Sequence, residues 1–405
     1  MLLSVLLLLL MVCGIQSTHY HGTMMTYYPK EIFSNGSVSV ILHFKSNSQT
    51  CTVDLYSCTG NCGTESTIII NAKIESSASW CQTERITTRL LPNNSPFQLS
   101  YAGGTWFSNL NGIDSWRAVT SVELRERSDT MQINSSPQTN TFPVLRVPSN
   151  CYININLLAF DPDGDVVRCR YADLSLTECA SPCTPPPVLA LSSTCTLSFS
   201  GTSTSNEGWY AVQMVMEDFP RQSITLTHNN GSYIVKSTSE AISQIPIQFG
   251  FLVDPAVPSC TKGYYLPGFL SPTPGHGAQF YTHVDKALEI NIRASAAHSV
   301  ISELLYSGPS SVVKTSFGSG EFSLTWTPSA AYEEESHPIC FAIQASYSSS
   351  VYQSELRCVV VTVKKKPKPI FLNALRMKIS TTLSLKDNRD VIENLVCNQC
   401  CNYVV

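Results

Sequence analysis

Short segments of alternating or continuous apolar residues recur along the whole chain, and clusters of turn-forming residues separate them at short intervals. This spacing is typical of β-sandwiches and barrels, because units that place a helix between parallel strands need longer connections. Only 14% of the 405 residues are charged, and the net charge of −4 does not favour nucleic-acid binding. We therefore expect an all-β protein, with roughly two to four domains for this length.

The chain begins with MLLSVLLLLLMVCGIQS, which is apolar from Met1 to about Val12. An apolar run of about 12 residues is too short to span a bilayer unaided, so residues 1–17 are predicted to be a secretory signal peptide. An uncleaved anchor is the alternative. No later stretch reaches roughly 18 consecutive apolar residues, so no transmembrane segment is expected in this form. We expect a soluble, secreted chain, held at the cell surface if a longer form carries an anchor.

Cysteine usage points to the same compartment. Twelve of the sixteen cysteines lie between the signal peptide and the C-terminal tail, which allows six disulfides in an oxidising environment. These are Cys51, Cys58, Cys62, Cys81, Cys151, Cys169, Cys179, Cys183, Cys195, Cys260, Cys340 and Cys358. Two pairs four residues apart, Cys58/Cys62 and Cys179/Cys183, also have a spacing that zinc sites use, but oxidation competes with metal in a secreted chain.

Whether a segment holds an even or an odd number of cysteines limits the possible disulfides but does not determine them. If Cys260 is counted with Cys340 and Cys358, this group and the preceding group from Cys151 to Cys195 both contain an odd number of cysteines, so one disulfide must connect the two groups. If Cys260 instead bonds to a cysteine of the preceding group, both groups contain an even number. We favour the second arrangement, with Cys340 bonded to Cys358 and the four cysteines between Cys51 and Cys81 closing among themselves.

Four Asn-x-Ser sequons are predicted glycosylation sites: Asn35, Asn93, Asn134 and Asn230. Each is expected to lie on an exposed surface if it is used. Pro96 directly after the second sequon makes glycosylation of Asn93 less favourable.

The strand patterns divide the chain into three β-sandwich segments and a tail. The first, residues 18–148, is a Cys-rich sandwich with predicted strands at 36–45, 66–74, 96–102 and 118–126. Residues 127–150 are polar, contain three prolines, and are interpreted as a linker or an interdomain strand pairing.

The second and third segments have the same type of pattern. Residues 149–256 are predicted to be an Ig-like or cadherin-like sandwich, with strands at 152–160, 165–172, 195–200, 208–219, 223–229 and 245–253. Residues 257–363 are predicted to be an Ig-like or fibronectin-like sandwich, with strands at 278–284, 287–296, 311–317, 321–328, 339–347 and 355–363. The last two strands are expected to form a hairpin that Cys340 and Cys358 can bridge.

The C-terminal tail, residues 364–405, begins with the basic run KKKPKP and continues as a short strand-and-helix pattern with nothing to pack on. We interpret it as a basic linker followed by an incomplete or disordered tail. Its cysteines Cys397, Cys400 and Cys401 form an odd set. They are candidates for intermolecular disulfides, and an accidental tail is the equally acceptable alternative.

One acidic motif stands out in "FDPDGDVVRC". The carboxylates of Asp161, Asp163 and Asp165 alternate around a glycine, an arrangement that suits an oxygen-ligated cation such as structural calcium. An EF-hand loop is excluded because Ala172 stands where its last acidic ligand belongs. By analogy with cadherin-like repeats, Glu217 and Asp218 are further candidate ligands at a domain junction. The competing and favoured interpretation is a plain Asp-Pro-Asp-Gly turn between two strands.

The sequence contains no G-x-S-x-G, no H-E-x-x-H, no phosphate-binding G-x-x-x-x-G-K and no dinucleotide-binding G-x-G-x-x-G motif. We therefore expect no enzyme, no cofactor beyond possible calcium, and no nucleic-acid partner. Three aromatic residues, Tyr101, Trp106 and Trp116, are candidates for a sugar-binding surface, although buried sandwich aromatics are the more ordinary interpretation.

Four strings carry a resemblance: VPSNCYININLLAFDPDGDVVRCRYA, YAVQMVMEDFP, LVDPAVPSCTKGYYLPGFLSPTP and HPICFAIQASYSSSVYQSELRCVVVTV. They resemble a family of vertebrate, mainly fish, extracellular proteins in which similar modules often precede a zona-pellucida-type domain. The resemblance covers about residues 18–363. It implies secreted or cell-surface sandwich modules with a structural or recognition role. This chain stops without such a C-terminal domain, so the resemblance does not extend to polymer assembly.

These observations favour a secreted, N-glycosylated, disulfide-bonded array that binds extracellular proteins or glycans without catalysis. A calcium-dependent adhesion module using Asp161, Asp163 and Asp165 is the second hypothesis, and a secreted enzyme of unknown class is the third.

Overall fold

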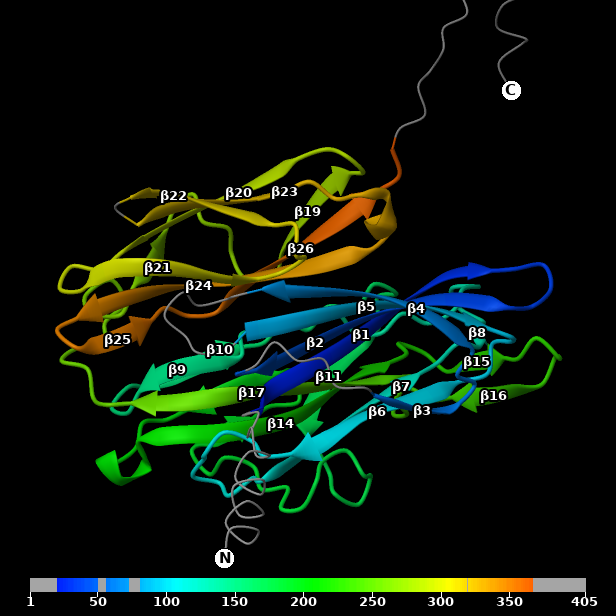
Figure 1. The fold of residues 1–405 in the computed structure, drawn as a ribbon, viewed down its shortest axis with the longest axis horizontal. Helices are drawn as coiled ribbons and strands as arrows, with labels where there is room; N and C mark the ends of the chain where they lie inside the picture. Colours follow the sequence, from blue (N-terminus) through cyan, green and yellow to red (C-terminus); the bar gives the residue numbers. More distant parts are fainter. Residues whose placement is uncertain (1–19, 50–55, 73–80, 319, 367–405) are drawn as a thin grey trace, which may run out of the picture. The chain divides into compact units, whose positions relative to one another are not determined.

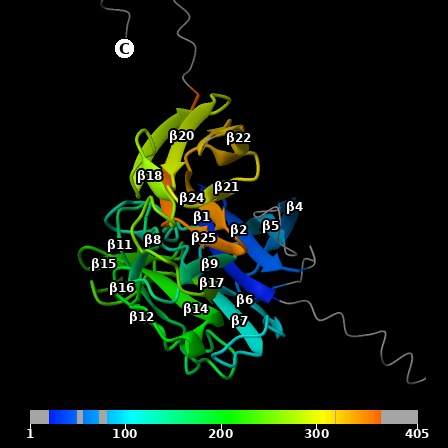
Figure 2. The ribbon, with the colours of Figure 1, turned by 90° about the vertical axis from the view of Figure 1, so that its left-hand side faces the viewer.

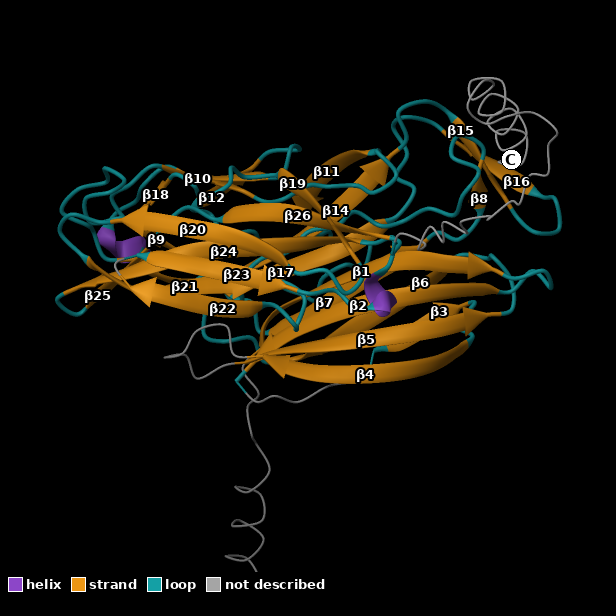
Figure 3. Cartoon of the chain, turned by 90° about the horizontal axis from the view of Figure 1, so that it is seen from above, coloured by secondary structure: helices purple, strands orange, loops and turns teal. Residues whose placement is uncertain are grey.

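Strands make up almost all of the regular structure of this protein. The computed structural model describes residues 20–49, 56–72, 81–318 and 320–366, with the backbone alone for residues 69–72 and 81. Within these ranges the only helices are two short 3₁₀ turns, η1 (Thr204–Asn206) and η2 (Ala330–Tyr332), shown in purple in Figure 3. The prediction of an all-β chain is therefore confirmed.

The largest sheet has eleven strands and is built around β17 (Gln244–Asp254). Along its length β17 pairs with β14 (Gly208–Phe219), and it also pairs with β1 (Tyr20–Ile32), β7 (Ser115–Val122) and, in parallel, β9 (Val144–Pro148). The remaining strands of this sheet are β2 (Val38–Ser48), β3 (Ser57–Gly60), β4 (Thr64–Ala72), β5 (Cys81–Leu91), β6 (Phe97–Gly104) and β11 (Val166–Tyr171). Figure 1 shows β17 beside β9 and β14. Because β17 is buried on both faces, its sequence is a nearly continuous apolar run.

This sheet joins parts of the chain that are far apart in sequence. Met24 of β1 lies opposite Ile247, and Val144 of β9 lies opposite Gly250. The strands before and after the predicted boundary at residue 148 therefore belong to one sheet. The first two predicted segments are therefore connected by strand pairing and not by a linker alone. The division into three tandem modules with the predicted boundaries stays a prediction.

Two small sheets flank the large one. The first has the strand order β10-β13-β12 and the second has the order β16-β15-β8. Their strands are β8 (Glu126–Arg127), β10 (Ile153–Asn156), β12 (Leu189–Leu191), β13 (Thr196–Phe199), β15 (Ile224–Thr227) and β16 (Tyr233–Lys236). β8 thus brings the end of the first predicted segment onto strands of the second.

Residues 257–363 form a sandwich of two sheets that enclose one core. The four-stranded sheet consists of β18 (Gly268–Leu270), β20 (Leu288–Ser295), β22 (Val313–Gly318) and β23 (Glu321–Trp326). The five-stranded sheet consists of β19 (Ala278–His283), β21 (Val300–Ser307), β24 (Ser336–Tyr347), β25 (Ser350–Gln353) and β26 (Arg357–Lys364). In Figure 2, β20 and β22 lie above β21 and β24. Buried residues from both sheets, such as Ile290 and Phe341, meet in the core between them.

The central strands of the five-stranded sheet, β24 and β26, are buried on both faces. In β24, Phe341 and Ile343 belong to the sandwich core, whereas Cys340 and Ala342 belong to the core that contains β14 and β17. The residues of β24 are therefore buried almost without interruption, and buried and exposed positions do not alternate along it. This double burial fixes the third predicted segment against the rest of residues 20–366.

Every strand predicted within residues 18–363 overlaps an observed one, and three long strands there were not predicted; the strand expected in the tail lies outside the described residues. The missed strands are β1, β5 and β21. Residues 127–150, interpreted as a linker or an interdomain strand pairing, contain β9. Residues 133–145, which lead into β9 and include its first two residues, are all buried. The strand-pairing alternative therefore describes this segment better than the linker.

Five disulfides join described cysteines: Cys58–Cys62, Cys151–Cys260, Cys169–Cys195, Cys179–Cys183 and Cys340–Cys358. The favoured arrangement, in which Cys260 closes back on the preceding segment, agrees with this set. Cys340 and Cys358 lie directly opposite one another on β24 and β26, as expected for the predicted hairpin. Cys58 and Cys62, like Cys179 and Cys183, are bonded to each other, which excludes them as zinc thiolates. Cys51 and the side chain of Cys81 lie outside the described residues, as do the signal peptide and residues 367–405, with Cys397, Cys400 and Cys401.

Candidate functional site

The predicted acidic turn lies in the connection from β10 to β11. One oxygen of Asp161 accepts hydrogen bonds from the backbone N–H groups of Asp163 and Asp165, at 2.9 and 3.1 Å. Gly164 closes the turn with a φ of 84°, in the left-handed region that glycine tolerates. The turn interpretation is therefore correct as far as the backbone is concerned. It does not exclude a cation site, because the second oxygen of Asp161 is buried and has no hydrogen-bond partner among the residues that the structure describes.

The side chains of this turn gather, and a fourth carboxylate lies near enough to interact with them electrostatically. Oxygen atoms of Asp161, Asp163 and Asp165 all lie within 4.8 Å of one another. Two ligand oxygens that share a calcium ion at about 2.4 Å lie at most about 4.8 Å apart, so the spacing fits one ion. Asp218, near the end of β14, is fully buried and interacts electrostatically with Asp161. We call Asp161, Asp163, Asp165 and Asp218 the acidic cluster.

Arg127 supplies part of the positive charge that this cluster needs. Its guanidinium is bonded to both carboxylate oxygens of Asp165, the second at 2.8 Å, and it also pairs with Asp129 at 2.8 Å. Asn134 accepts another of its hydrogen bonds, at 2.6 Å. Arg221 donates a hydrogen bond to the Gly164 carbonyl of the turn and forms no ion pair with its carboxylates among the described residues. The single positive charge of Arg127 is therefore smaller than the combined negative charge of the ionised carboxylates around it.

The remaining negative charge shows in the protonation of the cluster. Burial, followed by the charges of Asp218, Asp163 and Asp165, raises the pKa of Asp161 to about 8. Burial likewise raises the pKa of Asp163 to about 6, and it raises that of Asp218 to about 7 although Asn134 and Ser243 donate hydrogen bonds to it. Either protons or a cation must compensate such a site near neutral pH. The three predicted residues therefore have the spacing of a calcium site, and Asp218 adds negative charge beside it.

Asn134 connects the acidic cluster to the N-terminal half of the chain, and the expectation that it lies on an exposed surface is wrong. It is 0% exposed, and its side-chain amide donates to a carboxylate oxygen of Asp218 at 2.7 Å and to the backbone carbonyl of Ser135 at 2.9 Å. A glycan cannot be attached to a nitrogen enclosed in this way. The sequon describes only three adjacent residues, and burial is decided by strands far away in the sequence.

The other three sequons are exposed and lie close together. Asn35 and Asn230 each accept hydrogen bonds from the backbone and side chain of the serine two residues later, in matching turns. The side chain of Asn229 donates to the Gly36 carbonyl at 2.6 Å, and its backbone N–H donates to the side-chain oxygen of Asn94, the residue after Asn93, at 2.9 Å. The loops β1–β2, β5–β6 and β15–β16 thus gather the three predicted glycosylation sites in one area.

The aromatic residues proposed for a sugar-binding surface are buried instead. Tyr101, Trp106 and Trp116 are each less than 5% exposed. Tyr20 stacks on Trp116 with ring centres 4.2 Å apart and meets Trp106 edge-on at 4.6 Å. They form the core beside β1 and β6, so the core interpretation is correct.

A buried cluster of charged groups was missed because its members are scattered along the sequence. Glu335, 1% exposed, pairs with His337 at 2.8 Å, with His43 at 3.7 Å and with Lys30. Glu84 approaches the other nitrogen of His43 at 3.5 Å. Burial opposes the positive charge of His43, but the two carboxylates outweigh it and raise its pKa to about 9. This cluster ties β2 and β5 to the start of β24.

Comparisons with known proteins identify no family for this chain. No protein-family model matches it, and no curated protein matches it. Solved structures give only distant similarities. An endo-fucoidan hydrolase of glycoside hydrolase family 107 matches with 11% identity over 77% of this chain and 39% of its own, at a TM-score of 0.20. Drosophila N-cadherin EC1-4 matches with 13% identity over 66% of this chain and 58% of its own, at 0.21. Human protocadherin-24 EC1-2 matches with 11% identity over 58% of this chain and all of its own, at 0.18.

These similarities are too weak to support any functional statement. The resemblance to vertebrate extracellular proteins with zona-pellucida-type domains stays a prediction. Among the described residues, no helix is long and apolar enough to cross a membrane.

Proposed function

We propose that this protein is a secreted or cell-surface glycoprotein that acts as a non-catalytic structural or recognition module and binds extracellular proteins or glycans. The observation that carries the proposal is the set of five disulfides within residues 20–366. Structural disulfides persist in oxidising compartments and are rare in the cytosol. The three exposed sequons support the same location.

The fold suits recognition by preformed surfaces. The centre of the five-stranded sheet is buried on both faces, and β17 connects strands from distant parts of the chain. Loops on such a framework are held in place with little loss of conformational entropy on binding. Glycans at Asn35, Asn93 and Asn230 would cover one region of the surface and leave other regions open to a partner.

The test is binding of the mature chain to cells. The protein is secreted from animal cells, biotinylated, clustered on streptavidin and applied to a panel of cell lines and extracellular-matrix preparations. We expect saturable binding to at least one of these surfaces. The matched control is the same preparation after reduction and alkylation, which should not bind. Binding that never exceeds this control would contradict the proposal.

A calcium-dependent adhesion module is the second candidate, favoured by the unpartnered buried oxygen of Asp161 within the acidic cluster. Calcium at about 100 times its Kd would stabilise the folded state by about 2.7 kcal/mol. We expect calcium to raise the melting temperature of the natural protein and of Asp114→Asn, an exposed control outside the cluster, but not of Asp163→Asn. A melting curve of the natural protein that ignores calcium would eliminate this candidate.

A further inference from the structure

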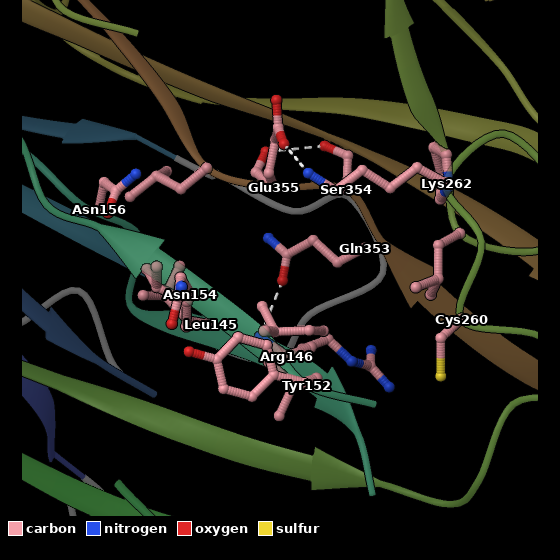
Figure 4. Close-up of a pocket in the computed structure, with 16 residues that line it drawn as sticks. Leu145, Arg146, Tyr152, Asn154, Asn156, Cys260, Lys262, Gln353, Ser354 and Glu355 are labelled. Carbon is pink, nitrogen blue, oxygen red and sulfur yellow. Dashed lines mark hydrogen bonds and ion pairs between the residues drawn. The ribbon is translucent and has the colours of Figure 1, made fainter. Parts of the chain in front are cut away.

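A cavity of about 320 Å³ lies where three strands end their pairing (Figure 4). Among the described strands, β10 pairs with β13 alone, β9 with β17 alone and β25 with β24 alone. Residues of all three strands line the cavity, and Cys260, Lys262, Leu266 and Pro267 line it from another segment. A cavity of this size is at the lower end of the range for small-ligand sites.

The cavity has an apolar floor and a polar rim. Leu145, Ile155, Leu266 and Leu356 are buried around it. The polar rim comes mostly from side chains that offer both a hydrogen-bond donor and an acceptor. A small ligand with an apolar face and several polar groups around its edge would match this division.

Two asparagines on β10 are the main feature of the rim. Asn154 and Asn156 are exposed and lie two residues apart, so their side chains emerge on the same face about 6.6 Å from each other. Asn156 accepts a hydrogen bond from Thr196 at 3.0 Å, which orients its amide and leaves the NH₂ group available. Among the described residues, Asn154 has no side-chain partner.

Two further residues complete the rim, as Figure 4 shows. Gln353 accepts a hydrogen bond from the backbone N–H of Arg146 at 2.9 Å, which fixes its carbonyl and leaves its NH₂ group to donate elsewhere. Tyr152 is 65% exposed and offers both a ring face and a hydroxyl group. The rim therefore presents fixed amides beside an accessible aromatic ring.

The charged residues at the cavity are already paired. Arg146 forms two hydrogen bonds with Asp254, at 2.9 and 3.0 Å. Lys262 and Arg357 both pair with Glu355. A charged ligand would have to compete with these pairs, whereas a neutral ligand would not.

The rim is also held in a fixed position. The Cys151–Cys260 disulfide joins the residue before Tyr152 to the opposite wall of the cavity. Next to it, the side chain of Asn150 donates to the carbonyl of Val257 at 2.8 Å and accepts from its N–H at 2.9 Å. A preorganised rim reduces the entropy lost on binding.

We infer that this cavity binds a neutral glycan, with one sugar ring held by Asn154, Asn156 and Gln353 and stacked near Tyr152. Vicinal hydroxyl groups donate and accept at once, as amide side chains do, and a pyranose ring has an apolar face. The inference rests on the extracellular location proposed above. An extended peptide fits less well, because a four-residue edge strand is too short to pair with much of another chain.

The test uses a printed array of neutral and acidic oligosaccharides, followed by calorimetric titration of the natural protein with N-acetyllactosamine and mannobiose. We expect binding to neutral glycans alone. In the double variant Asn154→Ala/Asn156→Ala, the loss of two hydrogen bonds should weaken binding by about 30-fold. The control is Asn291→Ala, an exposed strand asparagine of β20 outside the cavity, which should bind as the natural protein does.

Several results would overturn the inference. These are binding of acidic glycans alone, no glycan binding at all, or neutral-glycan binding that the double variant retains. Selection of a peptide from a displayed random library, with binding that survives the double substitution, would instead assign the edge to strand addition. The urea midpoint of the double variant should equal that of Asn291→Ala, which excludes unfolding as the cause of a loss. If the natural protein binds no neutral glycan and the double variant still binds cells in the assay described above, the cavity inference fails and the proposed function stands.

Discussion

The Cys151–Cys260 disulfide should contribute more to stability than any of the short-range disulfides. The perturbation is the double substitution Cys151→Ala/Cys260→Ala. These cysteines are 109 residues apart, and closing a loop of that length lowers the entropy of the unfolded chain by an amount worth about 4.8 kcal/mol. The same relation gives about 2 kcal/mol for Cys179 and Cys183, which are four residues apart.

The matched control is therefore Cys179→Ala/Cys183→Ala. Each pair has one cysteine that is at most 2% exposed and one that is more accessible, so the loss of packing should be similar. The assay is equilibrium unfolding in urea, followed by tryptophan fluorescence. We expect the long-range variant to lose about 3 kcal/mol more than the control. Equal losses in the two variants would refute the argument that loop length determines the contribution.

Three other predictions concern buried polar groups. The pKa of His43 is about 9 in the folded protein and 6.5 in the unfolded chain, so its pairing with Glu84 and Glu335 stabilises the fold fully below pH 6.5, and about 3 kcal/mol of this stabilisation is lost as the pH rises through 9. The urea midpoint of the natural protein should therefore fall over that pH range, and that of His43→Gln should fall much less. Parallel pH profiles of the two proteins would contradict this prediction. Replacing Asn134 by alanine should cost about 2 kcal/mol because Asp218 loses a buried donor, whereas Asn35→Ala should be nearly neutral, and equal urea midpoints would disprove the difference. Because calcium binds ionised carboxylates, its effect on the melting temperature should grow from pH 6 to pH 8, and a pH-independent effect would argue against the acidic cluster as its site.

Strands whose buried positions are apolar were predictable from sequence, and strands that bury polar side chains were less so. In β20, Ile290 and Ile292 are buried and their neighbours exposed, and this alternation is visible in the sequence. β1 is buried through its first nine residues, with threonine, tyrosine and histidine among them, so no alternation marks it. β5 buries Arg85, Thr87 and Arg89, which a hydrophobicity pattern treats as surface residues.

Contacts between distant segments explain what the sequence did not reveal about the sites. Asp161, Asp163 and Asp165 were found together because one turn contains them. Asp218 joins them only through the pairing of β11 with β14. The cavity rim likewise needs Asn154 of β10 and Gln353 of β25, which no local pattern connects.

The central claim is that this protein is an extracellular, disulfide-bonded glycoprotein, and peptide mapping without reduction tests it most directly. The protein is secreted from animal cells and analysed by mass spectrometry with and without glycosidase treatment. We predict cross-linked peptides for Cys151–Cys260, Cys169–Cys195 and Cys340–Cys358, with glycans among Asn35, Asn93 and Asn230 and an unmodified Asn134. Free thiols at these cysteines, in a protein retained inside the cell without glycans, would contradict the account.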